Sequence, residues 1–161
     1  MKNNHFKCGV LALAMLGVST SSLSADKTKM PGHSAHHNHI ALFSGVTSSE
    51  HASDPTVGLE FERRLPFMYG MFGIGGFVER VISEHSQSLV GVSAIIHPWK
   101  NLKANFTIGA ESADGHSETL HRVGLAYDFH IDQMSVSPTY NFDSVAGYTA
   151  NVFGIAFGMG F

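Results

Sequence analysis

The 161-residue sequence is poor in charge, in cysteine and in long apolar runs. Lys, Arg, Asp and Glu make up 14% of it, well below the roughly 25% of typical soluble domains. Cys8 is the only cysteine and lies in the segment interpreted below as a leader, so the mature chain has no disulfide, cysteine-ligated metal site or cysteine nucleophile. A formal net charge of −3 gives no basic footprint for nucleic acid. The length suits a single domain.

Residues 1–25 have the three parts of a secretory signal peptide. Lys2 and Lys7 supply the positive start, residues 8–18 are all apolar or glycine, and Leu23-Ser24-Ala25 fits a cleavage site. The apolar run is too short for a transmembrane helix, which needs about 20 residues. Cys8 precedes this run, which does not fit lipoprotein processing. We therefore expect an exported chain whose remaining part has no apolar stretch of 18 or more residues.

Residues 26–38 form a polar, His-rich segment that we interpret as a flexible lead-in. His33, His36, His37 and His39 follow the pattern His-x-x-His-His-x-His. Imidazole binds zinc, copper and nickel, and short His-rich tracts hold such ions. No carboxylate or cysteine completes a defined site, so a solvated linker with incidental metal affinity is the alternative. No other cofactor is expected.

Eight segments with strand-like alternation follow, separated by turn signals. The alternation is clearest at the end of the chain, where every second residue from Phe153 to Phe161 is large and apolar and those between are Gly or Ala. The first, third and fourth segments have apolar residues on both faces. Their phase, meaning which set of alternate residues points outward, therefore stays ambiguous. The expected strands are approximately 39–47, 56–65, 68–81, 88–97, 102–112, 119–130, 134–143 and 148–161.

The connections are expected to alternate between short and longer, more polar ones. Short turns at one end and longer loops at the other are typical of outer-membrane barrels. We therefore predict an all-β, eight-stranded, antiparallel up-and-down transmembrane β-barrel over residues 39–161, with both ends on the short-turn side. The expected short connections are 65–67, 98–101 and 131–133, and the longer ones are 48–55, 82–87, 113–117 and 144–147.

The composition of the two strand faces favours a membrane barrel over a soluble one. The polar face is rich in Gly, Ala and Ser, which suits the narrow interior of a small barrel. The other face carries Phe, Ile, Leu and Val, with aromatic residues towards the strand ends, as in the girdles of membrane barrels. A soluble periplasmic barrel with the apolar face inward is the alternative fold.

The last nine residues resemble the C-terminal strand of bacterial outer-membrane barrel proteins, which ends on an aromatic residue with apolar residues at alternate positions before it. This resemblance implies that Phe157, Met159 and Phe161 serve as a signal for the barrel assembly machinery. In size and pattern the chain also resembles the small eight-stranded barrels of the OmpA/OmpX type. The resemblance implies an outer-membrane location in a Gram-negative bacterium, in contact with lipid and lipopolysaccharide.

Charged residues on the polar face are expected to point into the barrel, where they must be paired or hydrated. We interpret them as an interior charge network that fixes the barrel, with a catalytic or conducting role as the alternative. Arg63 and Arg80 fall in the opposite phase near strand ends, where they can reach lipid headgroups. The expected lumen residues are Glu60, Glu62, Arg64, Lys103, Glu111, Arg122 and Asp128.

These features predict an outer-membrane protein with a structural or interaction role. A wide pore is not expected, since large channels need about 16 strands, and neither is an enzyme. Metal binding through the His cluster is one alternative. A lipid-modifying enzyme is another, because His116, Ser117, Glu118 and His121 include the residue types of a catalytic triad. A triad is defined by geometry, however, and consecutive strand residues point to opposite faces.

Overall fold

The structure, a computed structural model, describes residues 37–50, 52–66, 68–83 and 86–161. The predicted signal peptide and nearly all of the predicted His-rich lead-in lie outside the described residues. The described part is formed almost entirely of β-strands. These are β1 (Asn38–Ser48), β2 (Ser53–Arg64), β3 (Phe72–Val81), β4 (Gln87–Trp99), β5 (Leu102–Ala113), β6 (His116–Tyr127), β7 (Phe129–Ile131), β8 (Met134–Val145) and β9 (Tyr148–Gly160).

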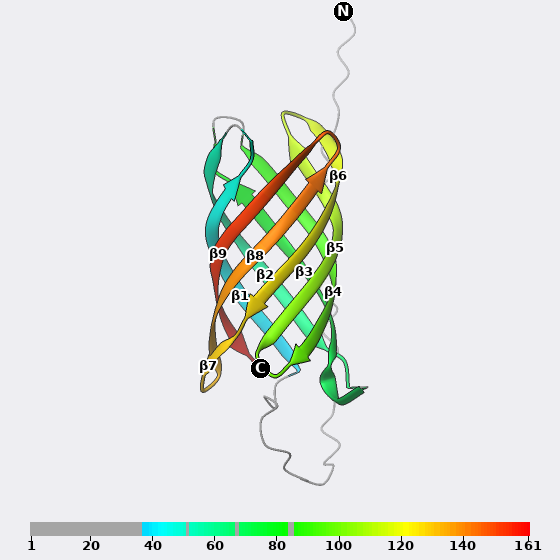
Figure 1. The fold of residues 1–161 in the computed structure, drawn as a ribbon, viewed down its shortest axis with the longest axis vertical. Helices are drawn as coiled ribbons and strands as arrows, with labels where there is room; N and C mark the ends of the chain where they lie inside the picture. The colour runs from blue at the N-terminus through cyan, green and yellow to red at the C-terminus, as the bar shows by residue number, and fades with distance from the viewer. Residues whose placement is uncertain (1–36, 51, 67, 84–85) are drawn as a thin grey trace, which may run out of the picture. The chain divides into compact units, whose positions relative to one another are not determined.

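The strands form one closed antiparallel sheet. Their order is β6-β5-β4-β3-β2-β1-β9-β8-β7, and β6 also pairs with β8, which closes the ring. Only Asp128 separates β6 from the short β7, and both strands pair with β8. They therefore act as one interrupted strand, and the fold is the predicted eight-stranded antiparallel barrel (Figure 1). At the interruption the backbone N–H of Asp128 donates to the carbonyl of Asn101 over 2.7 Å.

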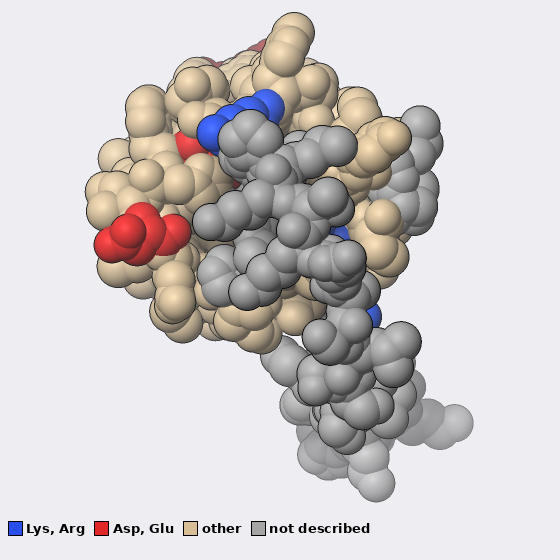
Figure 2. All heavy atoms as spheres, turned by 90° about the horizontal axis from the view of Figure 1, so that it is seen from below, with Lys and Arg blue, Asp and Glu red and all other residues tan. Residues whose placement is uncertain are grey.

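The first and last residues of the barrel segment lie side by side at one end of the cylinder. Asn38 and Phe161 exchange two backbone hydrogen bonds, of 3.1 and 3.0 Å. An even number of antiparallel strands requires this arrangement, and we call this end the closing end. Figure 2 views the molecule from this side, with charged side chains visible at a few separate places among uncharged ones. The opposite end, with the β1–β2, β3–β4, β5–β6 and β8–β9 connections, is called the loop end.

The predicted alternation of loop lengths is wrong in three places. Two expected longer loops are tight turns: β5 and β6 are joined by Asp114 and Gly115, with φ of 47° and 81°, and β8 and β9 by Ala146 and Gly147. Positive φ at both central residues is the geometry of a type I′ hairpin, which Asp-Gly favours. The β2–β3 connection, expected to be short, contains instead the 3-10 helix η1 (Met68–Gly70).

The apolar face points outward and the polar face inward, which is the reverse of the soluble alternative. Val92 on β4 is 71% exposed, while Thr107 on the inner face of β5 is 1% exposed. Along β9, Phe153, Ile155, Phe157 and Met159 all remain exposed. Exposed apolar bands of this kind need a lipid partner, because soluble monomers rarely present contiguous apolar surface above a few hundred Å².

The structure also settles the phase of the three ambiguous strands. The inner face includes Phe43 of β1, Phe77 of β3 and Leu89 of β4, all of which are buried. The rings of Phe43 and Phe77 fit there because glycines lie beside them on the neighbouring strands. A Cβ on Gly91, for example, would lie 2.8 Å from the Phe77 ring. In the described part of the chain, no helix combines the length and apolar character needed to cross a membrane.

Candidate functional site: the barrel lumen

The lumen nearest the closing end contains a cluster of charged side chains around Glu62, which we call the closing-end cluster. Its carboxylate lies 2.6 Å from His97 Nε2, 3.5 Å from Arg64 Nε and 3.8 Å from Lys103 Nζ. These side chains come from β2, β4 and β5, and alternate positions on each strand direct them inward. Their burial makes pairing necessary, because an isolated buried charge is costly.

The contacts of His97 define its proton arrangement. A guanidinium group can only donate, so Arg64 Nη2 donates to His97 Nδ1 over 3.3 Å. Nε2 must then carry the proton that is donated to Glu62. His97 therefore links the Arg64 guanidinium to the Glu62 carboxylate.

A second cluster, the central cluster, is built around Arg122 of β6. Its Nη atoms donate to both oxygens of Glu79, each over 2.7 Å, and Nε and Nη2 donate to Asp143 over 2.6 and 2.8 Å. The guanidinium also lies 4.3 Å from the centre of the Phe77 ring. Paired, bidentate contacts of this kind are the strongest available to arginine. Three strands of the barrel are thereby tied together through one side chain.

Buried apolar side chains extend from the Phe77 ring, which lies against Arg122, towards the loop end. Leu120 pairs with Val145 two residues beyond the Arg122–Asp143 pair, and both are buried. We call this set the apolar layer, and it comprises Phe77, Val81, Leu89, Leu120 and Val145. A second buried group, on β1 and β9, comprises Ala41, Phe43, Val152 and Ala156. Together they leave no room for a wide water-filled path through this part of the lumen.

Beyond the apolar layer, the loop end opens into a polar mouth. Tyr148 Oη donates a short hydrogen bond to Glu111 Oε1 across this mouth. A hollow of about 770 Å³ is lined mainly by polar side chains of the hairpins, among them Glu50 and Asp54.

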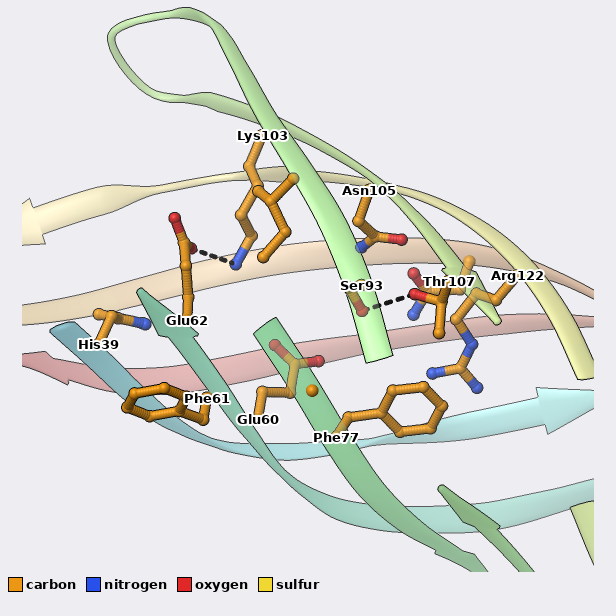
Figure 3. A pocket seen from close by; sticks show the side chains of 13 residues that line it. His39, Glu60, Phe61, Glu62, Phe77, Ser93, Lys103, Asn105, Thr107 and Arg122 are labelled. Atoms are coloured by element: carbon orange, nitrogen blue, oxygen red, sulfur yellow. Dashed lines mark hydrogen bonds and ion pairs between the residues drawn. The ribbon is translucent and has the colours of Figure 1, made fainter. Parts of the chain in front are cut away.

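The seven charged residues predicted for the lumen all lie on inward-facing positions, but in several groups. Glu62, Arg64 and Lys103 meet in the closing-end cluster. Arg122 belongs to the central cluster, and Glu111 lies at the mouth. Glu60 faces a small cavity between the two clusters (Figure 3), and Asp128 accepts a hydrogen bond of 2.6 Å from Ser137 Oγ. Among the described residues, no ion pair joins Glu60 or Glu62 of β2 to Arg122.

Sequence reasoning missed four partners in these groups. Glu79 and His97 lie on the strands of ambiguous phase, so their direction was not predicted. Asp143 continues the inward series of β8, and extending that alternation by one step identifies it. Tyr148 lies at a strand end, where the sequence predicts aromatic residues of the outer rim, whereas its hydroxyl reaches the mouth of the lumen.

The predicted histidine cluster lies only partly within the described residues, since His33 and His36 fall outside them. His37 is exposed, and its carbonyl accepts a 2.7 Å hydrogen bond from the backbone of Arg64. His39 points inward, and its Nε2 lies 2.8 Å from Ser135 Oγ. Within the described ranges, no group of three His, Cys, Asp or Glu residues is placed to hold a metal ion.

The residues considered for a catalytic triad do not converge. Ser117 lies 3.4 Å from Ser112 on the outer face, whereas His116 and Glu118 line a hollow at the mouth. His121 is exposed four residues along β6 from Ser117, which is about 13 Å in a strand. This arrangement does not provide a base within reach of the serine hydroxyl.

The outward residues lie as their phase predicts. Arg63 and Arg80 are exposed, and Arg80 Nη1 donates to Ser88 Oγ over 3.4 Å near the loop end. Phe157, Met159 and Phe161 are about half exposed, at 50, 49 and 56%. Their role as an assembly signal stays a prediction.

Comparison of the sequence with protein-family models and with curated proteins gives no match. The structure, in contrast, is similar to solved barrels. Neisserial surface protein A aligns with a TM-score of 0.56 at 11% identity, over 77% of this chain and 96% of that one. The chain has the fold of the small eight-stranded outer-membrane β-barrels.

Two further structures agree with this result. The N-terminal β-barrel domain of Pseudomonas aeruginosa OprF gives a TM-score of 0.58 at 11% identity, over 78% of this chain and 99% of that one. The attachment invasion locus protein Ail of Yersinia pestis gives 0.50 at 13% identity, over 77% and 96%. Such low identities establish the shared fold and leave the activity of this chain to be argued from its own residues.

Proposed function

We propose that this chain is a bacterial outer-membrane protein with a structural or interaction role and a closed lumen. The observation that carries this proposal is the combination of an exposed apolar band outside and a filled interior. A band of outward Phe, Ile, Leu and Val around every strand suits a bilayer. The fold shared with Neisserial surface protein A, OprF and Ail supports the same location.

The filled lumen argues against transport as the role of the barrel. The apolar layer and the central cluster follow one another along the interior, and Leu120 and Arg122 are only 0 and 2% exposed. Eight-stranded barrels have interiors that side chains fill. The clusters therefore stabilise the barrel, and the outer surfaces that meet lipid or partners perform its structural or interaction role.

The loop end is the surface for such partners, with the closing end on the periplasmic side. The described charged residues of the loop end are mainly acidic and include Glu50, Asp54, Asp114 and Glu118. Ail has been seen with the heparin analogue sucrose octasulfate. An acidic rim does not suit a polyanion of that kind, so we propose neutral or cationic partners for this chain.

Fractionation of cells that express the full-length chain tests the proposal. We expect recovery in the outer membrane and a change of gel mobility on boiling, because a closed barrel resists detergent until heated. Liposomes containing the purified barrel should not admit small sugars. Recovery in the soluble periplasm, or rapid sugar entry, would contradict the proposed location or the closed lumen, respectively.

A further inference from the structure

Arg80 is an isolated cation on the outer wall of the barrel, near the loop end. It is the only Lys or Arg at this end among the described residues, because Arg63 and Lys100 lie at the closing end and the others belong to the two lumen clusters. Its Nη1 donates to Ser88 Oγ over 3.4 Å. Within the described ranges no carboxylate forms an ion pair with it.

The surroundings of Arg80 are apolar and face the bilayer. A charged side chain on the lipid face is costly at depth and is tolerated where it can reach the headgroups. Because the described part of the chain supplies no counter-ion, the negative charge has to come from the lipid, and the anion that membrane lipids carry at this level is phosphate. The exposed outward neighbours of Arg80 are Val57, Val78, Ile82 and Val90.

Arg80 begins a row of exposed polar side chains that crosses four neighbouring strands. The register pairs Arg80 with Ser88 of β4. Ser112 of β5 is paired with Ser88 on one side and with Ser117 of β6 on the other. Adjacent strands are about 4.8 Å apart, so the row spans about 14 Å. We call this set the outer polar row, and it comprises Arg80, Ser88, Ser112 and Ser117.

The outer polar row presents hydrogen-bond donors. Ser88 accepts from Arg80 and keeps its own proton to donate, and most N–H groups of the guanidinium have no partner in the described part of the chain. Ser112 donates to Ser117 over 3.4 Å, which leaves the Ser117 proton for a ligand. Glu118 and the other described acids of the loop end line the mouth or lie at a hairpin tip. The row therefore suits an acceptor-rich anion, and arginine in particular suits phosphate.

We propose that the outer polar row binds the phosphorylated sugar headgroup of one lipopolysaccharide molecule, with a phosphate on Arg80 and sugar or phosphate oxygens on the serines. The width of the row favours this lipid over a glycerophospholipid, whose single phosphate and small headgroup would cover only Arg80 and Ser88. The acyl chains would lie on the apolar band below, beginning at Val78 and Val90. This inference rests on the proposed outer-membrane location, with the loop end in the outer leaflet.

Native mass spectrometry tests the site on protein purified from outer membranes in a neutral detergent. The probe is lipid A, the acylated and phosphorylated disaccharide of lipopolysaccharide. We expect saturable binding of one lipid A, and Arg80→Gln should weaken it by about tenfold or more, as loss of a charge-assisted hydrogen bond does. Arg63→Gln, which removes an exposed arginine at the closing end, is the matched control. Unchanged affinity in Arg80→Gln, or an equal loss in Arg63→Gln, would overturn the site.

Further probes test the chemistry of the ligand. Lipid A without its phosphates should bind more weakly and should not respond to Arg80→Gln. Phosphatidylglycerol should also bind more weakly, and the pair Ser112→Ala and Ser117→Ala should reduce the affinity for lipid A alone. Equal affinity for phosphatidylglycerol, or displacement of lipid A by an equal concentration of inorganic phosphate, would overturn the assignment to a sugar headgroup.

The source of the protein separates failure of this site from failure of the proposed function. Recovery from the soluble periplasm would overturn both. If the protein is recovered from the outer membrane with the expected change of gel mobility, lipid A binding that does not depend on Arg80 would overturn the site alone.

Discussion

Removal of the Arg122 side chain should be the most damaging single change to the lumen. The side chains of Glu79 and Asp143 are 0 and 3% exposed, and both depend on this guanidinium. In Arg122→Met, two buried carboxylates lose their partner while the volume is largely kept. Breaking a buried ion pair in this way costs about 3–5 kcal/mol. We expect a loss of at least this size, since two carboxylates are affected.

Urea-induced unfolding in phosphatidylcholine vesicles measures this loss. Trp99 is the single tryptophan, and at 71% exposure it reports on transfer of the barrel rim from lipid to water. Arg64→Met is the matched control, because Glu62 keeps His97 and Lys103 as partners when Arg64 is removed. We expect the control to lose about 1 kcal/mol or less, as partly exposed pairs do.

A triple variant separates the charge from the packing. Combining Arg122→Met with Glu79→Gln and Asp143→Asn removes the buried charges and should recover most of the lost stability, since neutral or apolar replacements of buried ion pairs are often tolerated. If Arg122→Met unfolds within about 1 kcal/mol of the parent barrel, the assignment of the central cluster as a stabilising element is wrong.

Three further predictions concern the outer face of the barrel, the pairing of β9 with β1 and the mouth of the lumen. Val92→Arg, midway along the outer face of β4, should cost about 2–4 kcal/mol in vesicle unfolding, whereas Ser112→Arg near the loop end should cost about 0–1 kcal/mol. Gly154→Val should prevent β9 from closing on β1, since even a Cβ would overlap the Phe43 ring; its purified chain should show no mobility change on boiling. Tyr148→Phe should cost about 1 kcal/mol in urea unfolding, because water at the open mouth replaces the lost hydroxyl.

The architecture was predictable where one face of a strand was apolar and the other small or polar. The last strand is the clearest case, because its large residues alternate strictly with Gly and Ala. Closure into a ring was also predictable. A sheet in a membrane must hydrogen-bond the backbone of both edge strands, and an even number of strands allows the first and last to pair antiparallel.

The phase of β3 was not predictable, and the central cluster was missed for that reason. Both faces of this strand carry apolar residues, and Phe77 lies inside because Gly91 leaves space for it. That space depends on the register between β3 and β4, which a single sequence does not provide. Glu79 follows Phe77 on the same face of β3. Because the inward face of β3 was not predicted, Glu79 was not identified as a partner of Arg122.

The turn lengths were mispredicted for a local reason. Asp114-Gly115 is a strong signal for a two-residue hairpin, and its polar flanks were interpreted as loop when they continue the strands. Strand ends that extend beyond the apolar band are polar on both faces, so composition alone cannot distinguish them from loops.

Spin-label accessibility in vesicles shows whether the apolar face of the barrel lies in lipid. The mature part predicted from the sequence lacks cysteine, so single labels are introduced as Ile108→Cys, on the outer face of β5, and Ser112→Cys, nearer the loop end. We expect the label at residue 108 to be reached by oxygen and shielded from a water-soluble nickel complex, with the opposite preference at residue 112. Equal access of the nickel complex to both labels would contradict it.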